Sequence, residues 1–354
     1  MSKDVDSAPA GKLLLARFAW FAVFYNVAVI LWGALVRATG SGAGCGNHWP
    51  LCNGQVIPVS PGLHTVIEFT HRQMVTGATF IVLALLIWTF RKTAKRDAAR
   101  FFAVASAVLL LNEAFLGALL VKLGYVTDNQ SVGRMVVLSV HLSNTLLLLA
   151  ALTLTARSAS LAQRGTPQPW TALHRARGFY WAVAGTATTI LVGVTGSLAA
   201  LGDTLFPAAS LTDALAQDYA AGAPMLLRLR ILHPASALAA GIFVIWLIVR
   251  SRKLVSIAAS LDAQEGQRLA VSTTLASRVV ALLALQIVLG VADLLLLAPA
   301  WMQMLHLLGA DLYWVALILL AAETIWPAAI ACGEATARAS GLSASSRTAQ
   351  SARP

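Results

Sequence analysis

The sequence is short of charged residues and of cysteine. Only 12% of its 354 residues are charged, whereas 58% are hydrophobic and the mean hydropathy is positive. Soluble domains carry roughly 25% charged residues, so the composition argues against a soluble enzyme. The net charge of +11 could suggest a nucleic-acid partner, but the basic residues lie in short clusters between apolar runs. That pattern is typical of membrane topology, and we expect no nucleic-acid partner.

The sequence contains several long apolar runs. About 20 apolar residues cross a hydrocarbon core as a helix, and such runs recur along the chain. We expect an all-α polytopic membrane protein with eight transmembrane helices. The first run lacks a convincing cleavage site, so we expect it to be retained as a helix. The predicted spans are roughly 18–36, 64–90, 100–121, 134–156, 178–201, 228–249, 271–298 and 303–331.

Basic residues divide unevenly between the two sides of this predicted membrane protein. Twenty fall in the two tails and in alternate links, five fall on the opposite side, and Arg72 lies inside the second span. An excess of Lys and Arg marks the cytoplasmic side. We therefore expect a bacterial plasma-membrane protein with both termini in the cytoplasm.

The chain also repeats itself weakly. Thr39-Gly40-Ser41 is echoed by Thr195-Gly196-Ser197, and Leu116-Gly117 is echoed by Leu289-Gly290. We expect two tandem four-helix bundles with pseudo-two-fold symmetry, in one orientation because each has an even number of spans. The predicted domains are a cytoplasmic segment 1–17, an N-terminal unit 18–157, a linker 158–177, a C-terminal unit 178–332 and a disordered tail 333–354.

One histidine falls near the predicted outer end of each even-numbered span. A lone histidine in a span is most often a packing residue, but four at one depth indicate a functional site. Two imidazoles from facing helices can hold one haem iron. A zinc site needs three or four clustered ligands, and a proton relay needs no pairs. We expect one bis-histidine haem pocket per repeat, toward the outer face. The four residues are His71, His141, His233 and His306.

The two repeats differ three residues before their first histidine, a position that shares a helix face with it. Glu68 stands there in the first repeat and Arg230 in the second. A carboxylate beside haem can move protons or stabilise a cationic intermediate, whereas a guanidinium suits haem propionates. The alternative is that Glu68 merely pairs with Arg72. Arg37 and Arg72 are further propionate candidates.

Two of the three cysteines, Cys45 and Cys52, flank a loop rich in Gly, Asn and Pro on the predicted outer side. Such a pair can form a disulfide there, whereas a metal site with His48 would be short of ligands. The pair either staples the loop or exchanges with other thiols. Among the acids within spans, we expect Glu113 to have a polar, bundle-facing role rather than a catalytic one.

Three stretches together resemble the haem A synthase family. They are Leu35-Val36-Arg37-Ala38-Thr39-Gly40-Ser41-Gly42, the loop from Cys45 that ends in Trp49-Pro50-Leu51-Cys52, and Glu68-Phe69-Thr70-His71-Arg72. The resemblance implies oxidation of the C8 methyl of haem O to a formyl group by successive hydroxylations, giving haem A for terminal oxidases.

The resemblance also implies roles for individual residues. Glu68, His71 and His141 would serve the haem O substrate, and His233 and His306 would ligate a haem b cofactor that passes electrons. Members with the loop cysteines form a disulfide there. Some have a second pair in the corresponding loop of the C-terminal half, which this chain lacks between residues 202 and 227.

Two rival functions also suit paired histidines in a membrane. One is a dihaem protein that carries electrons from a quinol, and the other is a haem or small-molecule transporter. Neither accounts for the cysteine loop followed by Glu68 and His71. The expected partners are haem O and haem A, membrane lipid and an electron donor, with quinol one candidate. Contact with the haem O synthase and a homo-oligomer stay open.

Overall fold

The structure is a computed structural model that describes residues 8–163, 179–259 and 263–323. Within these ranges the chain is helical and forms no strand beyond one isolated bridge, Cys52 to Gln55. The predicted tail, Cys332, most of the predicted linker and the end of the eighth predicted span lie outside them. The long helices are α1 (Ala8–Ala38), α2 (Leu63–Lys92), α3 (Ala98–Lys122), α4 (Val132–Gln163), α5 (Phe179–Leu205), α8 (Leu232–Ala259), α9 (Ala263–Leu295) and a final helix, Ala300–Glu323. The short ones are η1 (Ser41–Ala43), α6 (Leu211–Tyr219) and α7 (Met225–Arg230).

Eight helical stretches in the described residues are long and apolar enough to cross a membrane. The prediction of an all-α, eight-span integral membrane protein is therefore confirmed. Several helices extend beyond the approximate spans that were predicted. The first helix begins at Ala8 rather than at residue 18, because Leu15 and Ala16 are already buried against its neighbours. The fourth runs on to Gln163, where Arg157 pairs with Glu323.

The sixth predicted span is interrupted near its start. It comprises α7 and α8, which meet at Ile231. Pro234 lies in the first turn of α8, where a missing backbone N–H is tolerated, but it could not sit within a helix continuous with α7. The break places His233 at the beginning of α8.

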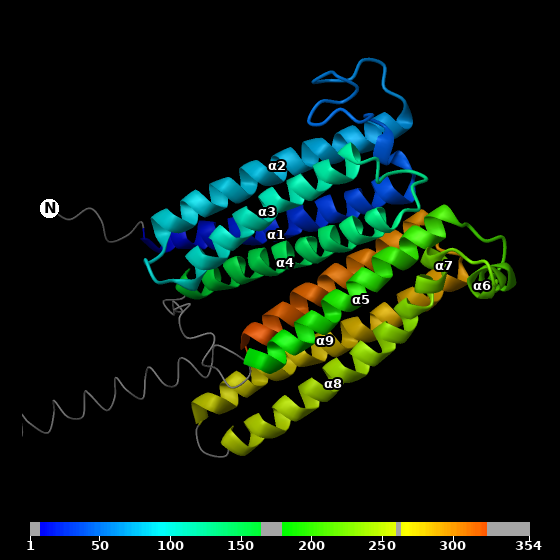
Figure 1. The fold of residues 1–354 in the computed structure, drawn as a ribbon. Helices are drawn as coiled ribbons and strands as arrows, with labels where there is room; N and C mark the ends of the chain where they lie inside the picture. The colour runs from blue at the N-terminus through cyan, green and yellow to red at the C-terminus, as the bar shows by residue number, and fades with distance from the viewer. Residues whose placement is uncertain (1–7, 164–178, 260–262, 324–354) are drawn as a thin grey trace, which may run out of the picture.

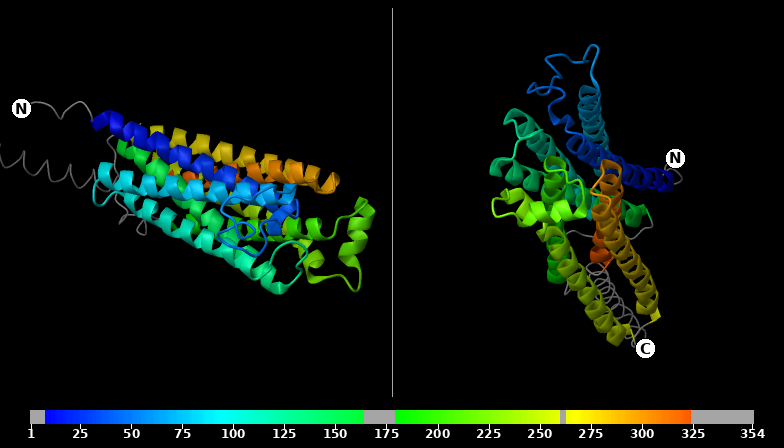
Figure 2. Two further views of the ribbon diagram at one scale, coloured as in Figure 1. Left: turned by 90° about the horizontal axis from the view of Figure 1, so that it is seen from above. Right: turned by 90° about the vertical axis from the view of Figure 1, so that its right-hand side faces the viewer.

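The helices form two groups that share a core. In the first, α4 lies against α1 and α3, and α2 lies against the same two helices. In the second, α8 lies between α5 and α9, and α4 contacts α5 to join the groups. The left view of Figure 2 shows the long helices running along one direction. One cluster of buried side chains extends from α1 and α4 into α8 and the final helix. The pseudo-two-fold relation between the groups stays a prediction.

The loops that were predicted to lie outside the membrane gather at one end of the molecule. Figure 1 shows the loop between α1 and α2 and the helix α6 at that end, opposite the N-terminus. Helix α6 was not predicted, although its sequence carries a start signal. The hydroxyl of Ser210 accepts the Asp213 N–H at 3.1 Å, and the Asp213 carboxylate accepts the Ala209 N–H at 2.9 Å, an arrangement close to a capping box.

Candidate functional site

The four histidines lie in one layer near this looped end. Counted from the first residue of each span, His71 is eight residues in, His141 nine, His233 eight and His306 six. At 1.5 Å per residue these positions correspond to depths of about 9–14 Å along the helices. The four spans all begin at the end that carries the loops (Figure 1), so the four histidine positions lie at similar distances from that end along their spans.

A glycine on the preceding long helix faces each histidine. The pairs are Gly33–His71, Gly117–His141, Gly196–His233 and Gly290–His306. A Cβ added to the glycine would lie 3.0, 4.0, 2.9 and 3.2 Å, respectively, from the imidazole Cε1. Three of these distances are too short for an unstrained contact. The glycines therefore let the rings lie directly against a helix backbone, a use of glycine that the sequence showed only as repeated Leu-Gly and Thr-Gly-Ser motifs.

In the second group the two histidine rings are close neighbours. The centroids of His233 and His306 are 6.4 Å apart, and the ring planes are inclined at 75°. An imidazole nitrogen binds a metal at about 2.0 Å, and the ring centroid lies about 1 Å further away, so two rings on opposite sides of one metal have centroids about 6 Å apart. The observed spacing fits one axially ligated iron.

The surroundings of these rings also suit ligation. Thr195 Oγ1 lies 3.3 Å from His233 Nδ1 and bonds Ser236 Oγ at 2.8 Å. A metal-bound histidine commonly uses its second ring nitrogen for such a bond. The Nδ1 of His306 is buried and has no hydrogen-bond partner among the described residues.

In the first group the nearest acid to a candidate ligand is Glu113. Its Oε1 lies 3.4 Å from His141 Nδ1, but the pair lacks hydrogen-bond geometry. The Glu113 carboxylate accepts hydrogen bonds from Asn144 Nδ2 and Thr145 Oγ1. Glu113 is therefore bundle-facing, as expected, but it is also directed at a histidine. His71 Nδ1 is buried without a hydrogen-bond partner in the described part of the chain.

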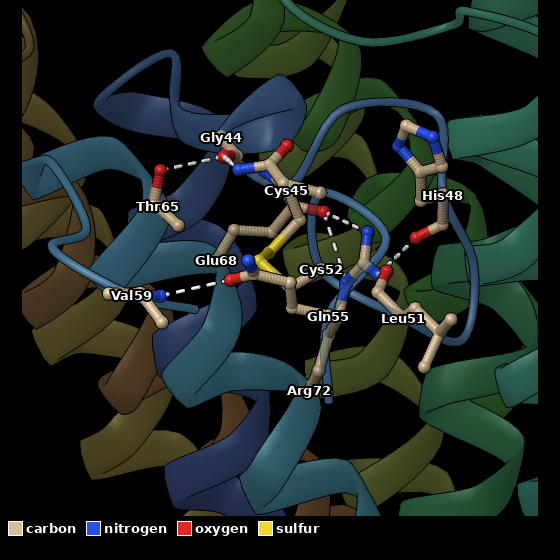
Figure 3. Close-up of a disulfide and its surroundings, with 11 residues drawn as sticks. Gly44, Cys45, His48, Leu51, Cys52, Gln55, Val59, Thr65, Glu68 and Arg72 are labelled. Carbon is tan, nitrogen blue, oxygen red and sulfur yellow. Dashed lines mark hydrogen bonds and ion pairs between the residues drawn. A yellow bond between two sulfur atoms is a disulfide. The ribbon is translucent and has the colours of Figure 1, made fainter. Parts of the chain in front are cut away.

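Glu68 is turned toward the cysteine loop (Figure 3). One carboxylate oxygen accepts a hydrogen bond from the backbone N–H of Cys45 at 2.7 Å. The other accepts hydrogen bonds from Nε and Nη2 of Arg72 at 3.1 and 2.5 Å. Glu68 is 4% exposed. Both of its oxygens are thus used within the protein, and the ion pair that was the alternative to a catalytic role is formed.

The same cluster holds the disulfide. Cys45 and Cys52 are bonded, with Cα atoms 4.4 Å apart, which confirms the predicted pair and removes both sulfurs as thiolate metal ligands. Arg72 Nη1 donates to the carbonyls of His48 and Leu51 at 2.8 and 2.7 Å. The described residues contain no group of three or more His, Cys, Asp or Glu side chains that could hold a metal ion.

Arg230 makes a comparable anchor in the second group. Its guanidinium pairs with Asp203 on α5 at 2.9 Å and with Asp218 on α6 at 2.6 Å. The guanidinium thus ties the outer loop, through α6, to the helix that leads into His233.

Arg37 lies between the two groups. Its Nη1 donates to the Ala200 carbonyl at 2.6 Å and to Thr204 Oγ1 at 3.0 Å, both on α5, and its Nη2 donates to Gln303 Oε1 at 2.8 Å on the final helix. All three arginines proposed as propionate contacts therefore already have protein partners.

Asp311 was missed in the sequence. It lies on the final helix, is 1% exposed, and its Oδ2 has no hydrogen-bond partner among the described residues. An acid within a span is costly and is itself a signal of function. That signal was present in the sequence.

The fold and these residues define a polytopic membrane protein with helix-borne histidines in one layer and a disulfide loop above one pair. The profile of the COX15-CtaA family, described as cytochrome oxidase assembly protein, matches residues 16–318. The chain belongs to the COX15-CtaA family, which confirms the resemblance seen in the sequence.

Individual relatives match over different lengths. A Thermus thermophilus chain named protoheme IX farnesyltransferase is 41% identical over 311 residues, which is 86% of this chain and 47% of that one. A heme A synthase of Shouchella clausii is 46% identical over 90 residues, covering 25% of this chain and 30% of its own. One of Alkalihalophilus pseudofirmus is 39% identical over 128 residues, covering 36% and 40%. The match thus spans about half of the Thermus relative and a smaller share of the two synthases.

Proposed function

We propose that this protein is a haem A synthase, an oxidoreductase that converts the C8 methyl of haem O to a formyl group by successive hydroxylations. The 6.4 Å spacing of the His233 and His306 rings fits one bis-histidine iron, but it would suit a dihaem electron carrier as well. The observation that carries the proposal is the disulfide loop fastened to Glu68, one turn before His71, which neither rival function accounts for. Membership of the COX15-CtaA family and the name of the Shouchella and Alkalihalophilus relatives, heme A synthase, support it.

The second group is proposed to hold haem b through His233 and His306. A bound haem b would supply one-electron redox chemistry there. The chain's own part is to orient the rings: Thr195 faces the second nitrogen of His233, and Gly196 and Gly290 let the imidazoles lie against α5 and α9. Arg230 is proposed as a propionate contact in addition to its two acids.

The first group is proposed to hold the substrate haem through His71 and His141, with Glu68 as the catalytic acid. Glu68 lies one turn from His71, and burial keeps water away from its carboxylate. Arg72 compensates its charge, so a cation that developed nearby would compete with this guanidinium for the same oxygen. Arg37 and Arg72 are the proposed propionate contacts in this group.

The location and partners belong to the same proposal. The charge bias of the links supports a bacterial plasma membrane, cytoplasmic termini and haem sites toward the outer face. The Thermus relative is named protoheme IX farnesyltransferase, which supports contact between this chain and the enzyme that makes haem O.

Extraction and chromatography of the haems from the purified protein test the proposal. We expect haem b together with haem O or haem A. Two equivalents of haem b, with no haem O or A after co-expression with a haem O synthase, would instead identify a dihaem electron carrier and overturn the synthase.

A further inference from the structure

Glu113 is held in place by α4, the helix that carries His141. Asn144 donates to its Oε2 at 2.5 Å, and Thr145 donates to its Oε1. Asn144 Nδ2 also donates to the Leu109 carbonyl at 2.9 Å, and Asn144 Oδ1 accepts a hydrogen bond from Asn112 Nδ2 at 2.8 Å. The carboxylate therefore has little freedom, and it stops 3.4 Å from His141 Nδ1.

His141 Nδ1 lacks any other acceptor. It is buried and makes no hydrogen bond with the described residues. A metal-bound imidazole usually donates its remaining N–H to a carboxylate or carbonyl, which fixes the tautomer and raises the basicity of the ligand. Glu113 Oε1, at 3.4 Å, is the carboxylate oxygen nearest to His141 Nδ1.

The second group has no acid at the matching place. Glu113 lies four residues before Gly117, and Gln286 lies four residues before Gly290. Gln286 is neutral, and its Nε2 is buried without a partner in the described part of the chain. In the described part of the chain, Glu113 beside His141 is therefore the only carboxylate within 4 Å of a ring nitrogen of one of the four histidines.

We infer that Glu113 is a positioning residue for His141. It accepts the Nδ1–H, leaves Nε2 for the iron, and lowers the midpoint potential of the first-group haem by favouring the oxidised metal. This inference rests on the proposed function, because it assumes haem in the first group.

The test combines a haem-free and a haem-bound measurement. In haem-free protein, nitrogen-15 spectra of labelled histidine should show His141 protonated at Nδ1, and E113Q should lose that preference. In haem-loaded protein, E113Q should shift the first-group potential upward. T145V removes a competing donor from Glu113 Oε1 but keeps the carboxylate, so it should not shift the potential upward. The second-group potential should stay unchanged.

E323Q is the matched control, since it removes an acid from the far end of the final helix and should shift neither potential. An unchanged tautomer and an unchanged potential in E113Q would overturn the role of Glu113. Absence of any haem in the first group of the wild type would instead defeat the proposed function, while the haem-free spectra would still decide the tautomer.

Arg37 joins three helices at the looped end. Its guanidinium links α1 to α5 through Ala200 and Thr204 and to the final helix through Gln303. On each of these three helices, a residue of a candidate pocket lies about one turn from the residue that contacts or carries the guanidinium. The residues concerned are Gly33, which faces His71, Gly196, which faces His233, and His306 itself.

A second contact joins the groups at the opposite end. Arg157 on α4 donates to Glu323 on the final helix at 2.7 Å. It lies 16 residues beyond His141 on α4, about 24 Å of helix. The two arginines thus connect the same groups, one beside the histidine layer and one far from it.

We infer that Arg37 is the positioning residue that fixes the two haem pockets relative to each other, and so sets the rate of electron transfer between them. The inference rests on the proposed function for its consequence but not for its geometry. The planar guanidinium satisfies three acceptors at once, which neither Gln nor the single ammonium of Lys reproduces.

Spin-label distances test the geometry without haem. In a Cys332→Ser background, one label pair replaces the exposed Lys122 and Tyr219 at the looped end, and another replaces the exposed Arg91 and Tyr180 at the other end. R37Q should broaden the distance distribution of the first pair only, and R157Q that of the second pair only.

The functional consequence is measured in haem-loaded protein. Because Arg37 is also a proposed propionate contact, the haem content of R37Q is measured first. In the R37Q molecules that hold both haems, electron transfer between the haems should be slower than in the wild type. R157Q should leave that rate unchanged. If the distance distribution of the first label pair is not broadened in R37Q, Arg37 does not fix the two pockets relative to each other. If that distribution is broadened but the rate of electron transfer is unchanged, Arg37 has no role in electron transfer.

Discussion

The two helical groups hold their outer loops at the same position with opposite charges. Three residues before the first histidine of each group, Glu68 accepts the backbone N–H of Cys45, and Arg230 pairs with Asp218 on α6. In both cases the side chain fastens the outer loop to the helix that bears the histidine. The first loop is also closed by a disulfide, whereas the second, without cysteine, contains a helix.

This comparison changes the meaning of the charge reversal. In the sequence it suggested an acid for chemistry in one pocket and a cation for propionates in the other. In the structure each residue has a mechanical task that accounts for its charge. The acid nearest to a histidine is Glu113, at 3.4 Å from His141. A catalytic role of Glu68 therefore has to be separated from its anchoring role by experiment.

The largest effect is expected when one axial ligand is removed from the second group. His306→Ala should abolish the stable haem b spectrum of the purified protein, because a bis-histidine iron loses an axial ligand. His71→Ala, the matched variant in the first group, should leave that spectrum in place. Absorption spectra of dithionite-reduced protein measure both, and undiminished haem b in both His233→Ala and His306→Ala would refute the cofactor assignment.

Glu68→Gln separates chemistry from anchoring. We expect it to retain the haem b spectrum and to stop or stall haem A formation, measured by chromatography of extracted haems. Gln can still accept the Cys45 N–H but cannot form the ion pair with Arg72. Limited proteolysis of the cysteine loop therefore supplies the second readout.

The two readouts together decide the role of Glu68. Lost activity with a protease-resistant loop supports catalysis, and lost activity with a sensitive loop supports anchoring alone. Full activity would defeat the catalytic proposal. Arg72→Gln is the comparison variant, because it breaks the same ion pair and leaves the carboxylate in place. It also removes the two hydrogen bonds from Arg72 to the loop carbonyls of His48 and Leu51, so its loop should be more sensitive to protease than that of Glu68→Gln.

Sequence reasoning succeeded where the physics is local. Apolar runs and clustered arginines suffice to predict eight spans, because the hydrocarbon core imposes length and composition on each helix separately. The short spacing of Cys45 and Cys52 was similarly informative. The Leu-Gly and Thr-Gly-Ser repeats contained the glycines that face the histidines, but not the reason for them.

It failed where a side chain's partner comes from far along the chain. Helix periodicity placed Glu68 on the face of His71, but it could not show that the loop would present the Cys45 N–H to the carboxylate. Arg37 bonds residues 163 to 266 positions away, a contact that no local pattern encodes. Helix α6 and Asp311 are different, because a capping signal and an acid within a span were both visible.

The glycines that face the histidines are expected to differ in their tolerance of a side chain. Gly196→Ala should displace the His233 ring and weaken haem b retention, since the added Cβ would lie 2.9 Å from the imidazole. Gly117→Ala should be tolerated, because the corresponding distance to His141 is 4.0 Å. Haem content after gel filtration measures the difference. Equal retention in both variants would show that the glycine contact does not constrain the ring.

The smallest effect is expected at the anchor of the second loop. Asp218→Asn keeps one acceptor for Arg230 and leaves the pair with Asp203, so we expect a loss of about 1 kcal/mol in the free energy of unfolding. Removal of the first loop's disulfide with Cys52→Ser should cost more, about 2–4 kcal/mol. Thermal unfolding in detergent, followed by tryptophan fluorescence, compares the two. A larger loss in Asp218→Asn would mean that the ionic anchor, rather than the covalent one, is the stronger of the two loop attachments.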